Sequence, residues 1–252
     1  ALAPGMSALE SGESQPGATL VLLPGMHGTG HLFGPLITAL GIRQVTRIVT
    51  VSYPFSAGDY VAVEAVIDKA QLIPEGEIVL LAESFAGPLA LRLALRLHTA
   101  RRLRGLVFAG SFIRSPLAYL SPRLIPLWTI RPPRWLLKKI LLNGCTEPMS
   151  LSLLEQVLHL VPPATLLNRL RAVLGCDERA TLPALAGVPT IYLHAQQDRL
   201  VGAHVIADFA ALHPLIVTLA APHLILLTRP GECAQAIVEM LGSHLTDSIQ
   251  SR

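Results

Sequence analysis

The chain has 252 residues, of which 51% are hydrophobic and only 15% are charged. This composition can form one large hydrophobic core and excludes a disordered or highly charged scaffold. The formal net charge of +3 comes from dispersed cations, and no run of Lys or Arg is longer than two residues, so we expect no nucleic-acid partner.

We expect neither a secretory signal nor a membrane span in the first 42 residues. Residues 1–17 lack a basic start and a long apolar run, and we expect them to form a flexible lead-in. Residues 18–42 are uncharged but interrupted by Pro and Gly, which predicts a strand, a loop and a helix and no stable membrane insertion. The odd set Cys145, Cys176 and Cys233 lacks metal-ligand spacing, so we expect reduced thiols, a cytoplasmic protein and no metal.

Six short apolar runs, each bounded by Gly, Pro or a charged residue, predict buried strands. They are rich in Val, Ile and Leu without strict alternation, which is typical of strands covered on both faces of a parallel sheet. The runs are 19–23, 47–51, 78–82, 105–109, 189–193 and 215–219.

Helical patterns alternate with these strands, at 59–72, 88–98, 201–212 and 232–245. Strand and helix in turn indicate an α/β fold, with a mostly parallel sheet flanked by helices. The alternation stops after the run at 105–109, where Leu-rich helical segments follow at 125–142, 150–160 and 164–174. We expect residues 111–177 to form a helical cap, inserted into a core of residues 18–110 and 178–252.

The junction between the third strand and its helix, Ala82-Glu83-Ser84-Phe85-Ala86-Gly87, predicts a nucleophile elbow. Such a tight turn requires small flanking residues and lifts the Ser84 hydroxyl to the carboxyl edge of the sheet. The N-terminus of the helix adds positive potential where negative charge develops. The alternative is that Ser84 only caps the helix that follows it.

Two later segments supply an acid and a base. Asp198 follows the strand at 189–193, and His223 follows the strand at 215–219. All three polar residues then lie past the carboxyl ends of strands, where open α/β sheets place their sites. His223 would take the proton of Ser84, and Asp198 would hold the imidazole in the required tautomer.

Three other acids compete for the role of Asp198. Asp177 precedes the return of the strands and suits a salt bridge, while Asp208 lies on the flank of a helix. Glu83 is too close to Ser84 in sequence to orient His223.

The backbone N–H groups of Phe85 and Met26 are the predicted oxyanion hole. Phe85 follows the nucleophile, and Met26 lies in the Gly-rich loop after the first strand. Such a loop also suggests phosphate binding, but the G-x-x-x-x-G-K-[ST] pattern is absent. No acid lies about 20 residues further on to hold a ribose, and we expect no cofactor.

The chain resembles the α/β-hydrolase superfamily in the segments LLPGMHGTG, AESFAGPLAL, YLHAQQDRLV and APHLILLTRP and in its helical insertion. It is most similar to small bacterial carboxylesterases with a helical cap, a group that includes the pimeloyl-acyl-carrier-protein methyl ester esterases of biotin synthesis. Two departures leave the substrate open: Pro24-Gly25 replaces the usual His-Gly, and Ala82 and Ala86 replace the elbow glycines.

These features predict a serine hydrolase that cleaves a carboxylic ester through an acyl-enzyme. A thioesterase or an acyltransferase would use the same triad, and a binding protein without turnover would keep the same pocket. We expect the cap to bind an acyl chain and an acidic acyl carrier protein. The residues assigned to this role are Trp128, Arg131, Arg134, Trp135 and Lys138, next to Lys139. The alternative is an ordinary amphipathic cap helix with its cations in water.

Overall fold

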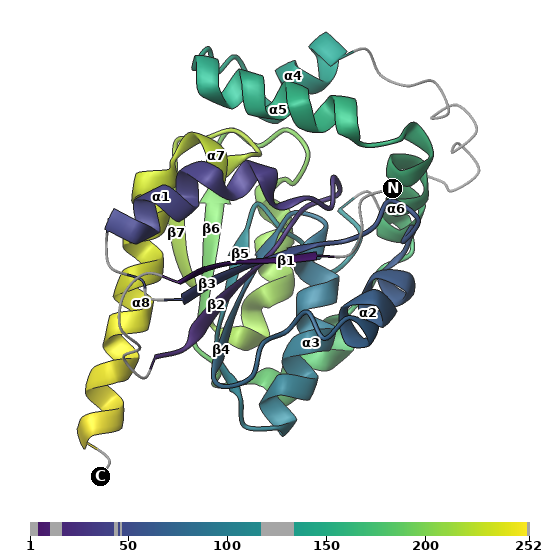
Figure 1. Cartoon of the computed structure of the whole chain (residues 1–252). Coiled ribbons are helices and arrows are strands. Elements are labelled where there is room, and N and C mark those ends of the chain that lie inside the picture. Colours follow the sequence, from purple (N-terminus) through teal and green to yellow (C-terminus); the bar gives the residue numbers. More distant parts are fainter. Residues whose placement is uncertain (1–4, 11–16, 43–44, 46, 117–133, 251–252) are drawn as a thin grey trace.

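A seven-stranded sheet in the order β1-β3-β2-β4-β5-β6-β7 forms the centre of the protein (Figure 1). The computed structural model describes residues 5–10, 17–42, 45, 47–116 and 134–250. The strands are β1 (Gly5–Glu10), β2 (Thr19–Leu23), β3 (Arg47–Ser52), β4 (Ile78–Glu83), β5 (Leu103–Ala109), β6 (Thr190–Ala195) and β7 (Leu215–Leu219). All neighbouring strands are parallel except β1 and β3.

Strand β1 corrects the expectation of a flexible lead-in over residues 1–17 at residues 5–10. It pairs antiparallel with β3 from Gly5 opposite Ser52 to Glu10 opposite Arg47. The pairing satisfies backbone N–H and C=O groups that β3 would otherwise leave open at the sheet edge. Because a ladder needs only backbone groups, the lack of an apolar run at 5–10 did not prevent it.

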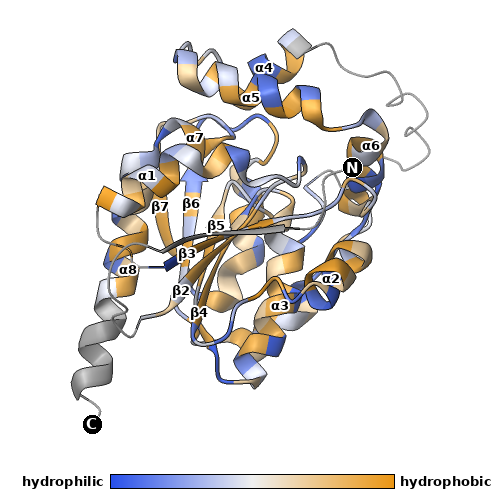
Figure 2. Cartoon of the chain, viewed as in Figure 1, coloured by the Kyte–Doolittle hydropathy of each residue, from blue (hydrophilic) through white to orange (hydrophobic). Residues whose placement is uncertain are grey.

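Helices cover both faces of the central strands, as expected for strands without a solvent face. The edge strand β7 corrects the expectation of six buried strands, because Leu215 and Ile216 are 62% and 47% exposed. One face carries α1 (Gly34–Ile42) and α8 (Pro230–Gln250), and the other carries α2 (Tyr60–Lys69) and α3 (Ala86–Thr99) (Figure 1). Strand β2 contributes side chains to the hydrophobic core on each face of the sheet. Leu20 and Leu22 belong to the core under α1 and α8, and Val21 and Leu23 belong to the core on the opposite face. In Figure 2 the central strands are mainly orange, while α2 and α3 carry both colours.

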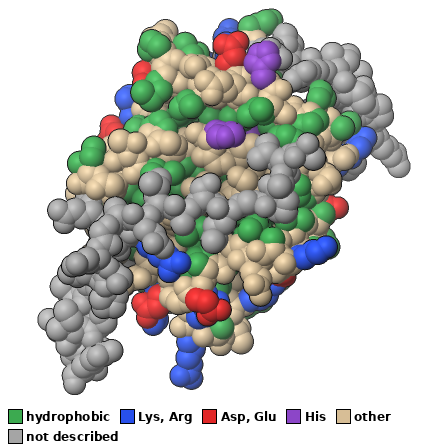
Figure 3. All heavy atoms as spheres, viewed as in Figure 1, with side chains coloured by type: hydrophobic (Ala, Val, Ile, Leu, Met, Phe, Trp, Pro, Cys, Tyr) green, Lys and Arg blue, Asp and Glu red, His purple; other side chains and the backbone are tan. Residues whose placement is uncertain are grey.

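Short helical segments complete the core: η1 (Gly30–Phe33), η3 (Arg179–Leu185), η4 (Ala203–Leu212) and α7 (Ile225–Thr228). The helix expected at 201–212 is therefore a 3₁₀ segment. On the face shown in Figure 3, positive and negative side chains are interspersed. None of the helices in the described part of the chain is both long and apolar enough to cross a bilayer.

The insertion after β5 contains three described helices, α4 (Arg134–Leu142), α5 (Pro148–Leu160) and α6 (Pro163–Leu174). Its two ends meet at a bridge between Arg114 and Asp177. Leucine and valine side chains of α4 and α5 pack on η1 and α7, with Leu142, Leu154 and Val157 against Leu32, Leu224 and Leu227. The cap helices thus lie over the loops at the carboxyl edge of the sheet (Figure 1).

Candidate active site

Ser84 lies at the turn between β4 and α3 with φ = 49°, in the left-handed region that favours glycine. The surroundings hold this strained turn: the Ser84 N–H donates to the Ala109 carbonyl at 3.0 Å, and Ser111 Oγ donates to the Ser84 carbonyl at 2.6 Å. A side chain at Gly87 would meet the Phe112 carbonyl at 2.0 Å, so only glycine fits there. Phe85, not Ser84, is the N-cap of α3, which excludes the helix-capping alternative.

The three predicted triad side chains form one hydrogen-bonded chain. Ser84 Oγ lies 2.9 Å from His223 Nε2, and His223 Nδ1 lies 2.7 Å from Asp198 Oδ2. The side chains of His223 and Asp198 are only 4% and 2% exposed. The other oxygen of Asp198, Oδ1, accepts the N–H groups of Leu200 and Val201 at 2.7 and 2.9 Å. This is the geometry that base-assisted nucleophilic attack requires.

The rival acids are engaged elsewhere. Asp177 binds Arg179 at 2.6 Å, and Asp208 lies 3.3 Å from Arg114. Within the described part of the chain, Asp198 is the one carboxylate that is hydrogen-bonded to His223.

Glu83 is hydrogen-bonded to the loop after β2 and not to His223. Its Oε2 accepts the Gly25 N–H at 3.2 Å and lies 3.2 Å from His27 Nε2. Burial raises the pKa of this carboxyl, but the hydrogen bond and charge of His27 and the Gly25 N–H outweigh burial and hold the pKa below its ordinary value. An ionised carboxylate is therefore carried by the residue that precedes Ser84.

Two opposing effects act on the pKa of His223. Burial lowers it, because the charged imidazolium loses its hydration. The negative charge of Asp198, its hydrogen bond and the more distant charge of Glu83 raise it, and the net result is a pKa above the ordinary 6.5. Asp198, which is hydrogen-bonded to His223, thus increases the proton affinity of the imidazole.

The predicted oxyanion donors lie on the loops on either side of Ser84. A Cβ added to Gly25 would lie 3.5 Å from the Ser84 Cβ, so the loop that carries Met26 runs directly beside the nucleophile. Within the described residues, the backbone N–H groups of Met26 and Phe85 donate to no protein acceptor. Both groups are free to bind a developing oxyanion, and their role remains a prediction.

The predicted cap residues are not gathered at the triad. Trp128 and Arg131 lie outside the described residues, and Arg134 begins α4. Trp135 is 66% exposed, and Lys138 Nζ lies 3.3 Å from Glu155 Oε2 on α5. Their role in binding substrate stays a prediction.

Arg169 on α6 is the site feature that sequence reasoning missed. Its side chain is fully buried, and its Nη1 donates a hydrogen bond to the Met26 carbonyl at 2.8 Å. Arg171, two residues along the same helix, is exposed. No local signal separates these two arginines, because the difference arises from the docking of α6 on the core.

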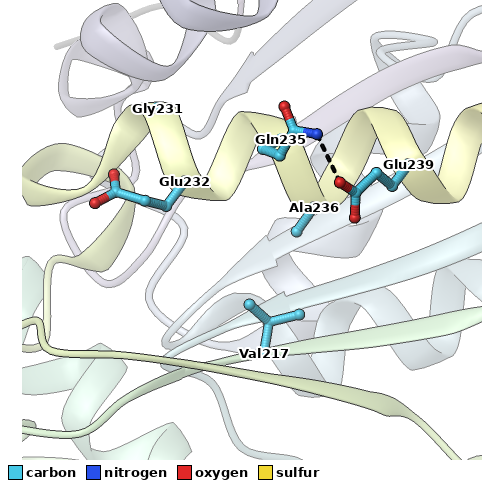
Figure 4. A pocket seen from close by; sticks show the side chains of 6 residues that line it. All are labelled: Val217, Gly231, Glu232, Gln235, Ala236 and Glu239. Atoms are coloured by element: carbon cyan, nitrogen blue, oxygen red, sulfur yellow. Dashed lines mark hydrogen bonds between the residues drawn. The ribbon is translucent and has the colours of Figure 1, made fainter.

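A groove of about 470 Å³ lies apart from this site, between the edge strand β7 and α8 (Figure 4). It is lined by Val217, Gly231, Glu232, Gln235, Ala236 and Glu239. None of the triad residues lines it. In the described part of the chain, no three His, Cys, Asp or Glu side chains are grouped as metal ligands.

Comparison with solved structures finds the same fold in bacterial enzymes. An esterase from Exiguobacterium antarcticum is 17% identical, with 95% of each chain covered and a TM-score of 0.76. A thermophilic esterase from Thermogutta terrifontis is 18% identical, with 95% of this chain and 93% of that chain covered and a TM-score of 0.73. A bromoperoxidase from Bacillus anthracis is 17% identical, with 94% of each chain covered and a TM-score of 0.76.

At these identities the likeness establishes the fold and leaves the substrate open. No curated protein matches the sequence significantly. The family model described as "Alpha/beta hydrolase family" matches residues 20–236, which include the elbow, the acid loop and the histidine loop. The chain therefore belongs to the alpha/beta hydrolase family.

Proposed function

We propose that the protein is a serine hydrolase that cleaves carboxylic esters, with Ser84 as the nucleophile, His223 as the general base and Asp198 as the orienting acid. The observation that carries the proposal is the bonded chain from Ser84 Oγ to His223 Nε2 and from His223 Nδ1 to Asp198 Oδ2. A buried imidazole that links a strained serine to a carboxylate is costly to maintain unless it serves chemistry.

The reaction runs in two halves. His223 Nε2 takes the proton of Ser84 as Oγ attacks the ester carbonyl, and the N–H groups of Met26 and Phe85 bind the resulting oxyanion. Collapse of this intermediate breaks the bond to the alcohol, which leaves with the proton from His223. Water then attacks the acyl-enzyme with His223 again as base, releasing the acid and restoring Ser84.

Hydrolysis of short p-nitrophenyl esters and labelling by a fluorophosphonate test this assignment together. We expect turnover of the ester and a single phosphonylated residue, Ser84, identified by peptide mass spectrometry. Matched oxygen esters and thioesters, with and without a competing alcohol, then separate esterase from thioesterase and acyltransferase. Labelling of Ser84 without turnover of any of these acyl substrates would favour a binding protein.

The acid limb of the pH profile follows from the raised pKa of His223. The base works only when neutral, so kcat/KM should fall as the pH drops through that pKa, with a midpoint above 6.5. Glu83→Gln removes a negative charge that raises this pKa, and the midpoint should move to lower pH. The measurement is kcat/KM on a p-nitrophenyl ester from pH 5 to 9. An acid-limb midpoint below 6.5 in the wild-type protein would contradict the assignment of the base.

An acyl-carrier-linked methyl ester is the substrate that we propose, which would make the protein a cytoplasmic enzyme of the biotin-synthesis type. Support comes from α4, where exposed Lys139 and Trp135 place a cation and a large apolar ring on the outside of the cap. An acidic carrier protein with a buried acyl chain suits such a surface. Lys138 contributes less, because it is already paired with Glu155.

Reversing the charge of Lys139, which is exposed on α4, tests whether the cap binds an acidic carrier protein. In Lys139→Glu we expect a several-fold rise in KM for an acyl-carrier substrate at low salt, and the penalty should shrink as salt rises, because exposed charges are screened within about 10 Å at 0.1 M. Turnover of p-nitrophenyl acetate should not change. The exchange Lys138→Glu with Glu155→Lys is the matched control, since it keeps the ion pair and the net charge. Equal losses on both substrates would remove the carrier protein from the proposal.

A further inference from the structure

Arg169 connects the cap to the loop that carries the predicted oxyanion donor. It projects from α6 and is fully buried. Its guanidinium donates three hydrogen bonds to backbone carbonyls: Nη1 to Met26 at 2.8 Å, Nη2 to Pro54 at 3.1 Å and Nε to Ala57 at 3.1 Å. A single side chain thus joins the cap, the loop after β2 and the loop after β3.

The charge of Arg169 has no carboxylate partner among the described residues. Its guanidinium carbon lies 5.5 Å from the centre of the Tyr53 ring, and the rest of its shell is carbonyl oxygen. Burial lowers the pKa of Arg169, in keeping with the cost of taking a cation out of water without an anion. A buried arginine that only stabilises the fold would be expected to form an ion pair with a carboxylate. The carbonyl contacts of Arg169 therefore indicate another role.

The bond to Met26 completes a set of contacts that fix the loop beside the nucleophile. The Pro24 carbonyl accepts Tyr53 Oη at 2.8 Å, and the Gly25 N–H donates to Glu83. The Gly25 carbonyl accepts the Gly28 N–H at 2.9 Å, and the Met26 carbonyl accepts Arg169.

The Met26 N–H lies between these anchored groups and makes no protein contact in the described residues. Because the peptide bond is planar and trans, the Met26 N–H points opposite to the Gly25 carbonyl. Anchoring the carbonyls on both sides of Met26 therefore sets the direction of this N–H.

Gly28 shows that the loop is shaped around the guanidinium. A Cβ at this position would lie 2.2 Å from Arg169 Nη1, and the residue has φ = 70°. Only glycine permits both the left-handed backbone and the approach of Arg169.

We propose that Arg169 is a positioning residue, which holds the Met26 carbonyl and thereby keeps the Met26 N–H facing the oxyanion that forms on attack by Ser84. This inference rests on the proposed function. It makes the docking of the cap a condition for catalysis, because the residue that orients the oxyanion loop belongs to the cap.

The test compares Arg169→Lys and Arg169→Met with the same two substitutions at the exposed Arg171. Loss of the anchored Met26 carbonyl should lower kcat for p-nitrophenyl esters by about 10- to 100-fold, somewhat less than deletion of an oxyanion donor, with KM changed by less than about threefold. A trifluoromethyl ketone that forms an oxyanion on Ser84 should lose affinity in parallel with kcat/KM. The midpoint of the acid limb should stay in place, because His223 and Asp198 are untouched. The Arg171 variants should retain wild-type values.

The fold of each variant is checked by thermal unfolding, and Arg169→Lys serves if Arg169→Met does not fold, since it keeps the positive charge but lacks the planar group that bonds all three carbonyls. A Lys variant that unfolds at lower temperature but keeps kcat and inhibitor affinity would overturn the inference while Ser84 labelling upheld the proposed function. A wild-type protein that neither hydrolyses esters nor reacts with the fluorophosphonate would overturn both.

Discussion

Ser84→Ala should lower kcat/KM for ester hydrolysis by several powers of ten, on the order of 10⁴ to 10⁶. The acyl-enzyme cannot form without Oγ, and the residual rate comes from the oxyanion donors and from binding. The fold should survive, because alanine keeps the Cβ that serine already accommodates at φ = 49°. The variant loses only the hydrogen bond to His223, worth about 1 kcal/mol, so thermal unfolding should shift by no more than about 3 °C.

The measurement is initial-rate kinetics on a p-nitrophenyl ester beside fluorophosphonate labelling. Ser152→Ala is the matched control, since it removes an exposed serine hydroxyl on α5 that takes no part in the candidate triad. It should still be labelled and should keep most of its turnover. Labelling of another residue, with Ser84→Ala fully active, would refute the assignment.

Asp198→Asn should cost on the order of 10⁴ in kcat, because it imposes the wrong imidazole tautomer. Asp198 Oδ1 accepts two backbone N–H groups, from Leu200 and Val201. An asparagine must keep its oxygen there, so its NH₂ group takes the place of Oδ2, facing His223 Nδ1. His223 Nδ1 must then accept a hydrogen bond from this NH₂ group, so the imidazole proton lies on Nε2. Nε2 can then no longer take the proton of Ser84.

Stopped-assay kinetics on Asp198→Asn and Asp177→Asn check this prediction. Asp177 is exposed and paired with Arg179, so its variant should match the wild-type rate. The loss in Asp198→Asn should diminish at high pH, where hydroxide can take the proton of Ser84 in place of the imidazole. If Asp198→Asn were nearly as active as the wild type, another acid would have to orient His223.

Much of this architecture was predictable because the determining signals are local. The six parallel strands were expected within two residues of their observed ends, since strands buried on both faces are continuously apolar. The burial of the last run was wrongly expected, because β7 lies at the sheet edge and is mainly exposed. The positions of Ser84, Asp198 and His223 followed from the strands that precede them. Parallel strands bring their carboxyl ends to one edge, so three residues far apart in sequence were expected to meet.

The amino-acid sequence alone therefore determined the six parallel strands, the elbow turn and the choice of candidate triad, through apolar runs, small residues and chain order. Tertiary structure decided the rest, because it depends on partners distant in the chain. Strand β1 exists through the open edge of β3, and Glu83 is held ionised by Gly25 and His27. Arg169 and Arg171 look alike in sequence, and only the docking of α6 buries the first against the oxyanion loop and leaves the second in water.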